Sequence, residues 1–541
     1  MKNLKTVRAR FARNAGLPFA QVLTEAKILD VLNDHGIKYR HRVFNPVTTI
    51  WGFLSQVLSD DHSCRDAVSR IIAHRAASGI RVCSPNTASY CNARRRMQTD
   101  VLRTLAKRTA EELQSSVAEE WKWNGRTVLI ADGSHVSMPD TPQNQAHYPQ
   151  PPTQKPGIGF PLARITVLLS LATGACHDLA IAPYKGKGTG ETTLLRRMYD
   201  ALKPGDVVLA DALYDNYFLV SDLRDRGIDL VARVKYPRAG SLTKRSRPDG
   251  AIRAWQRPQK PRGMTGEQYR TYPKTLLMRE VAVDARDKNN RAKQFKVVTT
   301  ILDAAIDGGQ IGSLYERRWS GELDLRSIKS TIQMDILRCK TPDMVEKEIW
   351  THLLAYNLLR TVMAVAASEN DIVPCQVSFK GAKQIVTAFA PKIESARPRN
   401  RAALIEAMLT AVAYHRVGNR PGRWEPRARK SRASRKTRSR NREPSPGWST
   451  IARNGIKLVP FVRNAGADLT RKANAVDPTD ARCATSRRTE GFPEEEGKSS
   501  LPHRRRIGYT HQQTFRSQQP GDDLVPGFLS RRNQQLVALR L

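Results

Sequence analysis

Two short apolar runs that each end in an aspartate constrain the fold of this chain most. The first covers residues 126–132 and ends at Asp132, and the second covers residues 206–211 and ends at Asp211. Short apolar runs bounded by turn signals are typical of buried strands, and α/β sheets bind their ligands at the carboxyl ends of such strands. An aspartate before glycine is often only a turn residue. Because the same design occurs twice in one region, we predict two strands that deliver both carboxylates to one edge of a sheet.

The segments around these runs alternate between strand and helix patterns. Further strands are predicted at residues 164–172, 175–182 and 228–234, with helices at 191–202 and 216–226 and a loop at 138–161. The glycine-rich stretch 185–191 lacks the Gly-Lys-Ser/Thr ending of a nucleotide-binding P-loop, so we interpret it as a turn. Strands joined by crossover helices build a mixed sheet. The predicted fold class is therefore α/β, with a ribonuclease-H-like mixed sheet and helices.

A run without proline, residues 315–335, predicts a helix with one chemically active edge. At about 100° per residue, four polar side chains fall within roughly 60° of one another, beside an apolar stripe. These four are Tyr315, Arg318, Glu322 and Lys329. A carboxylate is a suitable ligand for Mg²⁺, and Arg and Lys neutralise phosphate oxygens. An ordinary solvated helix has a similar composition, so the spacing of the four residues has to decide between the two interpretations.

That spacing, Tyr-x2-Arg-x3-Glu-x6-Lys, resembles the signature helix of the IS4-type DDE transposases of bacterial insertion sequences. The resemblance extends over roughly residues 80–425. It implies a catalytic triad of acids that holds a pair of Mg²⁺ or Mn²⁺ ions, and a separate set of residues that binds DNA phosphates. The first set is Asp132, Asp211 and Glu322, and the second is Tyr315, Arg318 and Lys329.

The resemblance implies phosphoryl transfer on DNA. In such a site water attacks a phosphate to nick the strand, and the liberated 3′-hydroxyl then attacks target DNA, so that no covalent protein–DNA intermediate is required. The implied partners are double-stranded DNA with terminal inverted repeats, target DNA, and a second copy of the chain in a synaptic homodimer. Family members commonly carry a basic residue after the second aspartate, whereas this chain has Ala212. Two alternatives stay open: a catalytically impaired DNA-binding regulator of transposition, and a two-metal nuclease without joining activity.

The charge of the chain also indicates nucleic acid. Its 541 residues contain 90 Lys and Arg against 51 Asp and Glu, a formal net charge of +39. A protein this basic typically binds a polyanion, although part of the excess lies in the Arg-rich run 416–442. The N-terminus lacks an apolar signal region, and no long uncharged apolar window occurs. We therefore expect a bacterial cytoplasmic protein associated with the nucleoid and not with a membrane.

The composition divides the chain into six predicted parts. The catalytic domain is expected in two pieces separated by an insertion, with helices before and after it. The parts are a helical DNA-end-recognition domain at 1–120, the first catalytic part at 121–234, a β-rich insertion at 235–300, the second catalytic part with the signature helix at 301–392, a C-terminal helical segment at 393–424, and a basic tail at 425–541 that we expect to be largely disordered.

Three further features have both a functional and an ordinary interpretation. Ser84 before proline predicts the start of a helix whose Tyr90 and Arg94–Arg96 could lie along DNA, or form only a solvated face. The resemblance implies that the insertion grips the transposon end, so Trp255 is a plausible DNA contact, with core packing at least as probable an explanation. His352 lies in an apolar helical run, where we expect a core histidine and not a metal ligand.

Overall fold

The computed structural model describes residues 22–155, 157–235, 240–243, 249–286 and 292–417. All of these residues belong to the same compact unit of the chain. The tail predicted at 425–541 lies outside the described residues, so that prediction stays untested. Within the described ranges, no helix has the length and apolar character needed to span a membrane.

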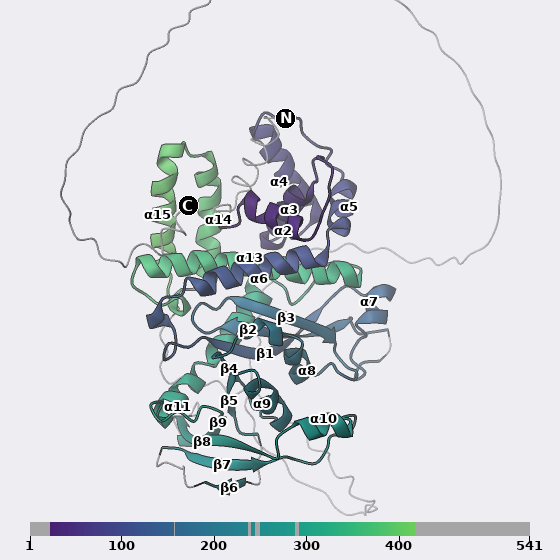
Figure 1. Ribbon diagram of the computed structural model, residues 1–541. Helices are drawn as coiled ribbons and strands as arrows, with labels where there is room; N and C mark the ends of the chain where they lie inside the picture. The colour runs from purple at the N-terminus through teal and green to yellow at the C-terminus, as the bar shows by residue number, and fades with distance from the viewer. Residues whose placement is uncertain (1–21, 156, 236–239, 244–248, 287–291, 418–541) are drawn as a thin grey trace, which may run out of the picture. The chain divides into compact units, whose positions relative to one another are not determined.

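The architecture is built on a nine-stranded mixed sheet in the order β3-β2-β1-β4-β5-β9-β8-β7-β6 (Figure 1). Strands β1, β4 and β5 pair in parallel, and all other neighbours are antiparallel. The strands are β1 (Val128–Ser137), β2 (Leu162–Ser170), β3 (Cys176–Pro183), β4 (Val207–Ala210), β5 (Asp229–Arg233), β6 (Gly240–Leu242), β7 (Ala251–Gln256), β8 (Thr275–Arg286) and β9 (Ala292–Thr299). The mixed α/β sheet predicted from the sequence is confirmed.

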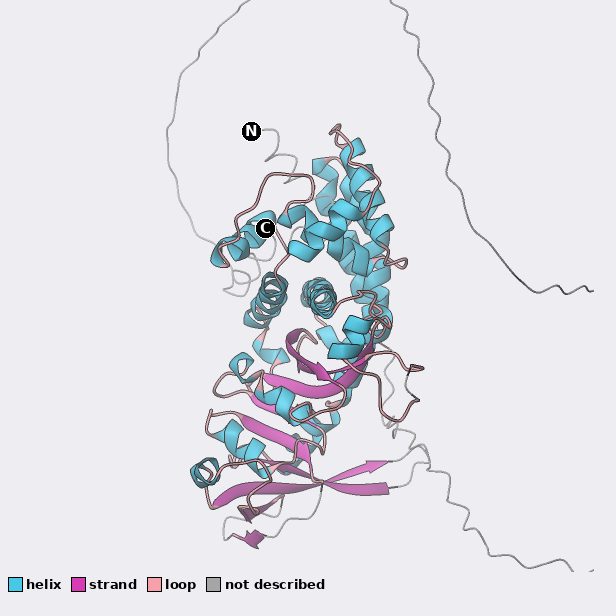
Figure 2. Ribbon diagram, turned by 90° about the vertical axis from the view of Figure 1, so that its right-hand side faces the viewer, coloured by secondary structure: helices cyan, strands magenta, loops and turns pink. Residues whose placement is uncertain are grey.

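The helices occupy both faces of this sheet and much of the remaining chain (Figure 2). The α-helices are α2 (Glu25–Asp34), α3 (Pro46–Leu58), α4 (Cys64–Ala77), α5 (Ala88–Arg96), α6 (Thr99–Ser115), α7 (Pro142–His147), α8 (Glu191–Arg196), α9 (Tyr217–Arg224), α10 (Gly266–Thr271), α11 (Gly308–Glu316), α12 (Trp319–Arg326), α13 (Pro342–Glu369), α14 (Phe379–Ser395) and α15 (Pro398–Tyr414). Single turns of other helix types are η2 (Glu119–Trp121), η3 (Tyr199–Ala201), η4 (Ser327–Thr331) and η5 (Pro374–Gln376).

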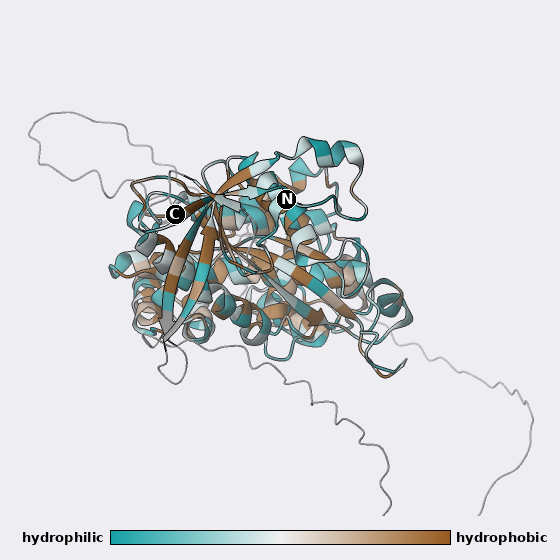
Figure 3. Ribbon diagram, turned by 90° about the horizontal axis from the view of Figure 1, so that it is seen from below, coloured by the Kyte–Doolittle hydropathy of each residue, from teal (hydrophilic) through white to brown (hydrophobic). Residues whose placement is uncertain are grey.

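The parallel strands are buried on both faces, which explains why they read as continuous apolar runs. In β4, Val207 and Leu209 belong to one hydrophobic cluster with residues of α11 and α13, whereas Val208 and Ala210 belong to another with residues of α8 and α9. Hydrophobic segments run along the strands (Figure 3). The alternation follows from the two-residue period of a strand.

The strands predicted as a separate β-rich insertion continue the same sheet. Strand β9 pairs antiparallel with β5, opposite Val231, and β8, β7 and β6 follow outward. Trp255 on β7 is 1% exposed and packs in the cluster that contains α9. The interpretation of Trp255 as a DNA contact is therefore wrong, because its ring is not accessible.

Several local predictions about helix starts and helix surfaces differ from the structure. Helix α5 begins at Ala88 after Thr87, so Ser84 is not its N-cap. Its Tyr90 and Arg94 are buried, and both donate hydrogen bonds to the side-chain oxygen of Gln56 on α3. These two side chains therefore hold helices together and do not face DNA. The predicted 138–161 loop contains the short helix α7, which Thr141 caps, and the helix predicted at 191–202 is split into α8 and η3.

Helix α13 runs for 28 residues beside the sheet and connects distant parts of the chain. It lies against α6 in Figure 1, and the side chain of Asn357 fixes this arrangement. The Asn357 amide donates to the backbone oxygens of Ala106 on α6 and Cys176 on β3, and its oxygen accepts the Cys176 N–H. His352 is buried in this helix as predicted, and burial lowers its pKa to about 3. It is therefore neutral at physiological pH.

A buried ion pair joins α13 to α12. The guanidinium of Arg360 donates to the carboxylate of Asp324 and also, at 2.8 Å, to the Tyr356 hydroxyl. That hydroxyl donates to the carbonyl of Gly174, in the turn between β2 and β3. Gly174 has φ +73°, and a Cβ there would approach the Arg360 guanidinium to 2.6 Å, so glycine is needed for two reasons.

Replacing Arg360 with Met is expected to lower the free energy of unfolding by about 3–5 kcal/mol, because it leaves the buried Asp324 carboxylate uncompensated. Chemical denaturation of the purified protein measures this loss. The double variant Asp324→Leu/Arg360→Met is the matched control and should recover much of the stability, since it removes both charges. Equal stability of Arg360→Met and the wild type would contradict a structural role for the pair.

Candidate active site

The two aspartates singled out in the sequence are neighbours in the sheet. Ala131 of β1 pairs in parallel with Ala210 of β4, and the next residue on each strand is Asp132 and Asp211, respectively. Because the two strands run in the same direction, both aspartates come one residue after this pair and lie side by side. The expected delivery of both acids to one place in the sheet is confirmed by this register.

The expectation that β1 ends at Asp132 is wrong. The strand continues to Ser137 because it keeps pairing with β2, where Asp132 lies opposite Val167. Strand β4 stops at Ala210, so Asp132 lies inside β1 at the point where its other neighbour ends. The two acids therefore lie where β4 ends, beside the middle of β1.

Local hydrogen bonds orient the two carboxylates. Asp132 is buried and its Oδ1 accepts the N–H of Gly133 at 2.9 Å. Asp211 is half-buried, and its Oδ1 accepts the N–H of Leu213 at 2.7 Å in the turn that leads toward α9. An Asx turn of this kind fixes the side chain directly after the strand.

Glu322 reaches the same region on α12, which packs closely on β1. A Cβ added at Gly321 would lie 2.7 Å from Cγ2 of Ile130, two residues before Asp132 on that strand. Glycine thus permits an approach of helix to strand that no larger residue allows. The single glycine in the signature motif is explained by this contact.

The signature segment is not the single regular helix that the sequence predicts. Helix α11 ends at Glu316, the N–H groups of Arg318 and Gly321 bond three residues back, and α12 then begins at Trp319. From Ser327 to Thr331 the backbone widens into the π-helical turn η4. π turns inside helices are often found at functional sites. The tightening and widening change which side chains share a face.

The first three residues of the motif remain together on this segment. An Arg318 nitrogen lies 2.9 Å from Glu322 Oε1, and the guanidinium carbon lies 5.9 Å from the centre of the Tyr315 ring. Burial alone would lower the pKa of Arg318, but Tyr315 and the Glu322 carboxylate raise it. Arg318 is therefore a permanent cation that holds the Glu322 carboxylate.

Lys329 lies in the π turn near His135 of β1. Burial, and next the positive charges of Arg164 and Lys329, lower the pKa of His135. The end of the segment is tied to the same strand: the Ser137 N–H donates to the Asp335 carbonyl at 2.9 Å. Lys329 therefore lies near His135, three residues after Asp132 on β1.

A fourth carboxylate, Glu191, lies at this edge of the sheet and was not singled out from the sequence. A Cβ added at Gly133 would overlap the carboxylate of Glu191, the first residue of α8. The hydroxyl of Tyr214 is buried nearby; its pKa is raised by burial and by the charges of Glu191, Asp132 and Asp211. The Gly133 that follows the first aspartate was the available sequence signal, because it marks a close approach.

The donor chemistry of these residues fits a divalent cation. Carboxylate oxygens are the ligands that Mg²⁺ prefers, and Asp132 and Asp211 offer them side by side. Among the described residues, no three His, Cys, Asp or Glu side chains are grouped closely enough to hold an ion. The Glu322 carboxylate is held through its Oε1 by Arg318 of the same segment.

The sequence is similar to known proteins. Residues 123–358 match the family described as Transposase DDE domain, a stretch that spans β1, β4 and the signature segment. The chain thus contains a stretch that matches the transposase DDE domain and is similar to the IS4-type DDE transposases. It is 27% identical over 356 residues to the transposase InsG for insertion sequence element IS4 of Escherichia coli strain K12, covering 64% of this chain and 76% of that protein.

A solved structure, the piggyBac transposase synaptic complex with hairpin DNA, is also similar. The match covers 75% of this chain and 85% of that one, with 14% sequence identity and a TM-score of 0.38.

DDE transposases act on DNA by nicking and transesterification and generally use divalent metal ions. This transposase therefore has DNA as its partner.

Replacing Gly321 with Ala is expected to destabilise this transposase by about 1–3 kcal/mol, because the added methyl meets the stiff, β-branched side chain of Ile130. Denaturation measures the loss, and DNA cleavage should fall with it as Glu322 is displaced. Gly312→Ala in α11 is the control: its Cβ meets nothing closer than 3.4 Å, so it should gain about 0.5–1 kcal/mol. Gains in both variants would contradict the close packing of α12 on β1.

Proposed function

We propose that this transposase cleaves DNA at the terminal inverted repeats of its own insertion sequence and joins the freed ends to target DNA by cut-and-paste movement. The observation that carries the proposal is the register of β1 and β4, which sets Asp132 beside Asp211. A helix bearing a third acid, Glu322, packs on the same strand. Such a set of acids is what phosphoryl transfer on DNA requires.

Asp132, Asp211 and Glu322 are the residues proposed to hold a pair of Mg²⁺ or Mn²⁺ ions. When bound, these ions would supply activation of the attacking oxygen and stabilisation of the leaving 3′ oxygen. The two aspartates are already oriented by the N–H groups of Gly133 and Leu213. Arg318 contacts only Oε1 of Glu322, so Oε2 of that carboxylate remains available as a metal ligand.

Arg318 links the Glu322 carboxylate to DNA. It is 17% exposed and belongs, with Tyr315 and Lys329, to the residues proposed to bind DNA phosphates. A phosphate competes with Glu322 for the guanidinium, and a guanidinium binds phosphate through paired hydrogen bonds. Arrival of the scissile strand would thus draw Arg318 away from Glu322 and free Oε1 of that carboxylate as well.

The wider assembly is part of the same proposal. The net charge of +39 supports binding of double-stranded DNA, both repeat ends and target, as does the name of the InsG relative. We propose a synaptic homodimer that holds two ends, a catalytic sheet of the ribonuclease-H type that begins near residue 121, and end recognition by the helices before it. The protein would act in the bacterial cytoplasm, on DNA of the nucleoid.

A cleavage assay tests this function. Purified protein is incubated with a labelled duplex carrying the DNA that flanks its own gene, with and without Mg²⁺. We expect metal-dependent nicking at the repeat boundary and joining into a plasmid, both lost in Asp132→Asn. Cleavage without repeat preference or joining would instead indicate a nuclease, and repeat binding without cleavage would indicate a regulator.

Glu322→Gln is expected to abolish cleavage while the affinity for repeat DNA stays within about threefold. The substitution keeps the shape of the side chain but removes the negative charge needed at the site. Gel-shift titration and cleavage on the same duplex give both values. Glu316→Gln, an exposed position at the end of α11, is the matched control and should change neither. Loss of binding in Glu322→Gln would show that the residue is structural.

A further inference from the structure

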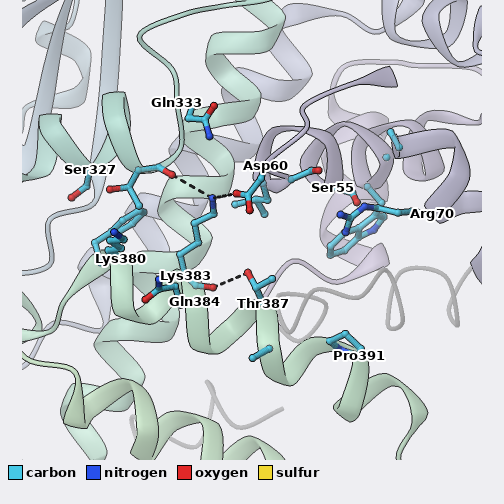
Figure 4. A pocket seen from close by; sticks show the side chains of 18 of the residues that line it. Ser55, Asp60, Arg70, Ser327, Gln333, Lys380, Lys383, Gln384, Thr387 and Pro391 are labelled. Carbon is cyan, nitrogen blue, oxygen red and sulfur yellow. Dashed lines mark hydrogen bonds and ion pairs between the residues drawn. The ribbon is translucent and has the colours of Figure 1, made fainter. Parts of the chain in front are cut away.

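A cavity of about 1480 Å³ lies between three parts of the chain that are distant in sequence. Its walls come from α3 and α4, from α12 and η4 of the signature segment, and from α14. Figure 4 shows Lys383 on α14 directed toward Asp60, which follows α3; their charged atoms are 3.3 Å apart. The volume exceeds the range usual for drug-sized ligands, so a polymer segment fits it better than a small molecule.

The charged side chains that line the cavity are mostly cationic. They are Arg70, Arg326, Lys380 and Lys383, against the single acid Asp60. Arg70 is partly neutralised by Asp66 at 2.8 Å. Arg326 and Lys380 are exposed and make no side-chain ion pair or hydrogen bond with any described residue. Two cations of the cavity are therefore available to an anionic ligand.

The rest of the wall also suits a nucleic-acid strand. The N-terminal turn of α14, with Ser378 as N-cap and Phe379 as first residue, lines the cavity and adds the positive end of a helix dipole. Leu323, which is 40% exposed, gives apolar surface beside the cations. Basic grooves with apolar or aromatic surface are typical of sites that track a DNA strand.

The chain's own terminal segments are poor occupants by the same criterion. Residues 1–21 contain five Lys and Arg and no acid, and the stretch after Val417 begins with a basic run. Like charges would oppose their docking beside Arg326 and Lys380. Charge complementarity selects a polyanion instead.

We propose that this cavity binds the phosphates of a DNA segment continuous with the strand at the catalytic site. The proposal rests on the proposed function and adds a second contact surface to it. Arg326 and Ser330 line the cavity from the segment that carries Glu322 and Lys329, so DNA held here contacts that segment from a different side. Binding in the cavity therefore helps to hold the helix of Glu322 against β1.

The test compares DNA affinity at several salt concentrations for the full-length protein and for Lys380→Ala and Arg326→Ala. Each lost phosphate contact should weaken binding severalfold and reduce the slope of log affinity against log salt by about 1. Both side chains are exposed, so melting temperatures should not change. Lys392→Ala, on the same helix but outside the cavity, is the matched control and should keep the slope of the wild type.

Equal losses in Lys380→Ala and Lys392→Ala would show a general charge effect and overturn the site, as would unchanged affinity in both cavity variants. Charge reversal in Lys380→Glu should weaken binding further than Lys380→Ala; tighter binding would indicate that a basic segment of the chain occupies the cavity, and would also overturn the proposal. Failure of the proposed function is seen separately, as absence of cleavage and joining by the wild type.

Discussion

The parallel pairing of β1 with β4 is the contact on which the candidate active site depends. It brings together two acids that are 79 positions apart in the chain, since Asp132 and Asp211 each follow a residue of the pair Ala131 and Ala210. Burial of both faces of β4 fixes the register, because a slip by one residue would turn every side chain to the opposite hydrophobic cluster. The stability of the sheet thus determines the geometry of the acids.

Close approaches permitted by glycine complete the site around this pair of strands. Gly321 lets α12 lie against Ile130, and Gly133 leaves room for the Glu191 carboxylate beside Asp132. At both glycines, the space that a side chain would fill is occupied by a side chain of another element. The buried Asp324–Arg360 pair then anchors α12 to α13 on its other side. The helix of Glu322 is held from two directions.

Charge is arranged so that the site and its surroundings have opposite signs. Carboxylates collect where β4 ends, while cations line the cavity bounded by α4, η4 and α14. Arg318 pairs with Glu322. Such an arrangement attracts a polyanion to the protein as a whole, while the carboxylates offer oxygen ligands to a divalent cation.

The sequence by itself determined the strands, the mixed α/β class and the residues of the signature motif, because apolar period and residue spacing are local properties. It also predicted that Asp132 and Asp211 would meet, since two strands of the same design belong to one sheet. It could not give the end of β1, which depends on pairing with β2, or the burial of Trp255 and Arg94.

Only the tertiary structure decided the irregular signature segment, the place of Glu191 and the cavity beside α14. Helical spacing assumes a constant turn, whereas the backbone tightens before α12 and widens at η4. Glu191 comes beside Asp132 through the folding of a separate loop over Gly133. These features arise from contacts between residues far apart in the chain, and a local pattern contains no record of which distant surface will supply the contact.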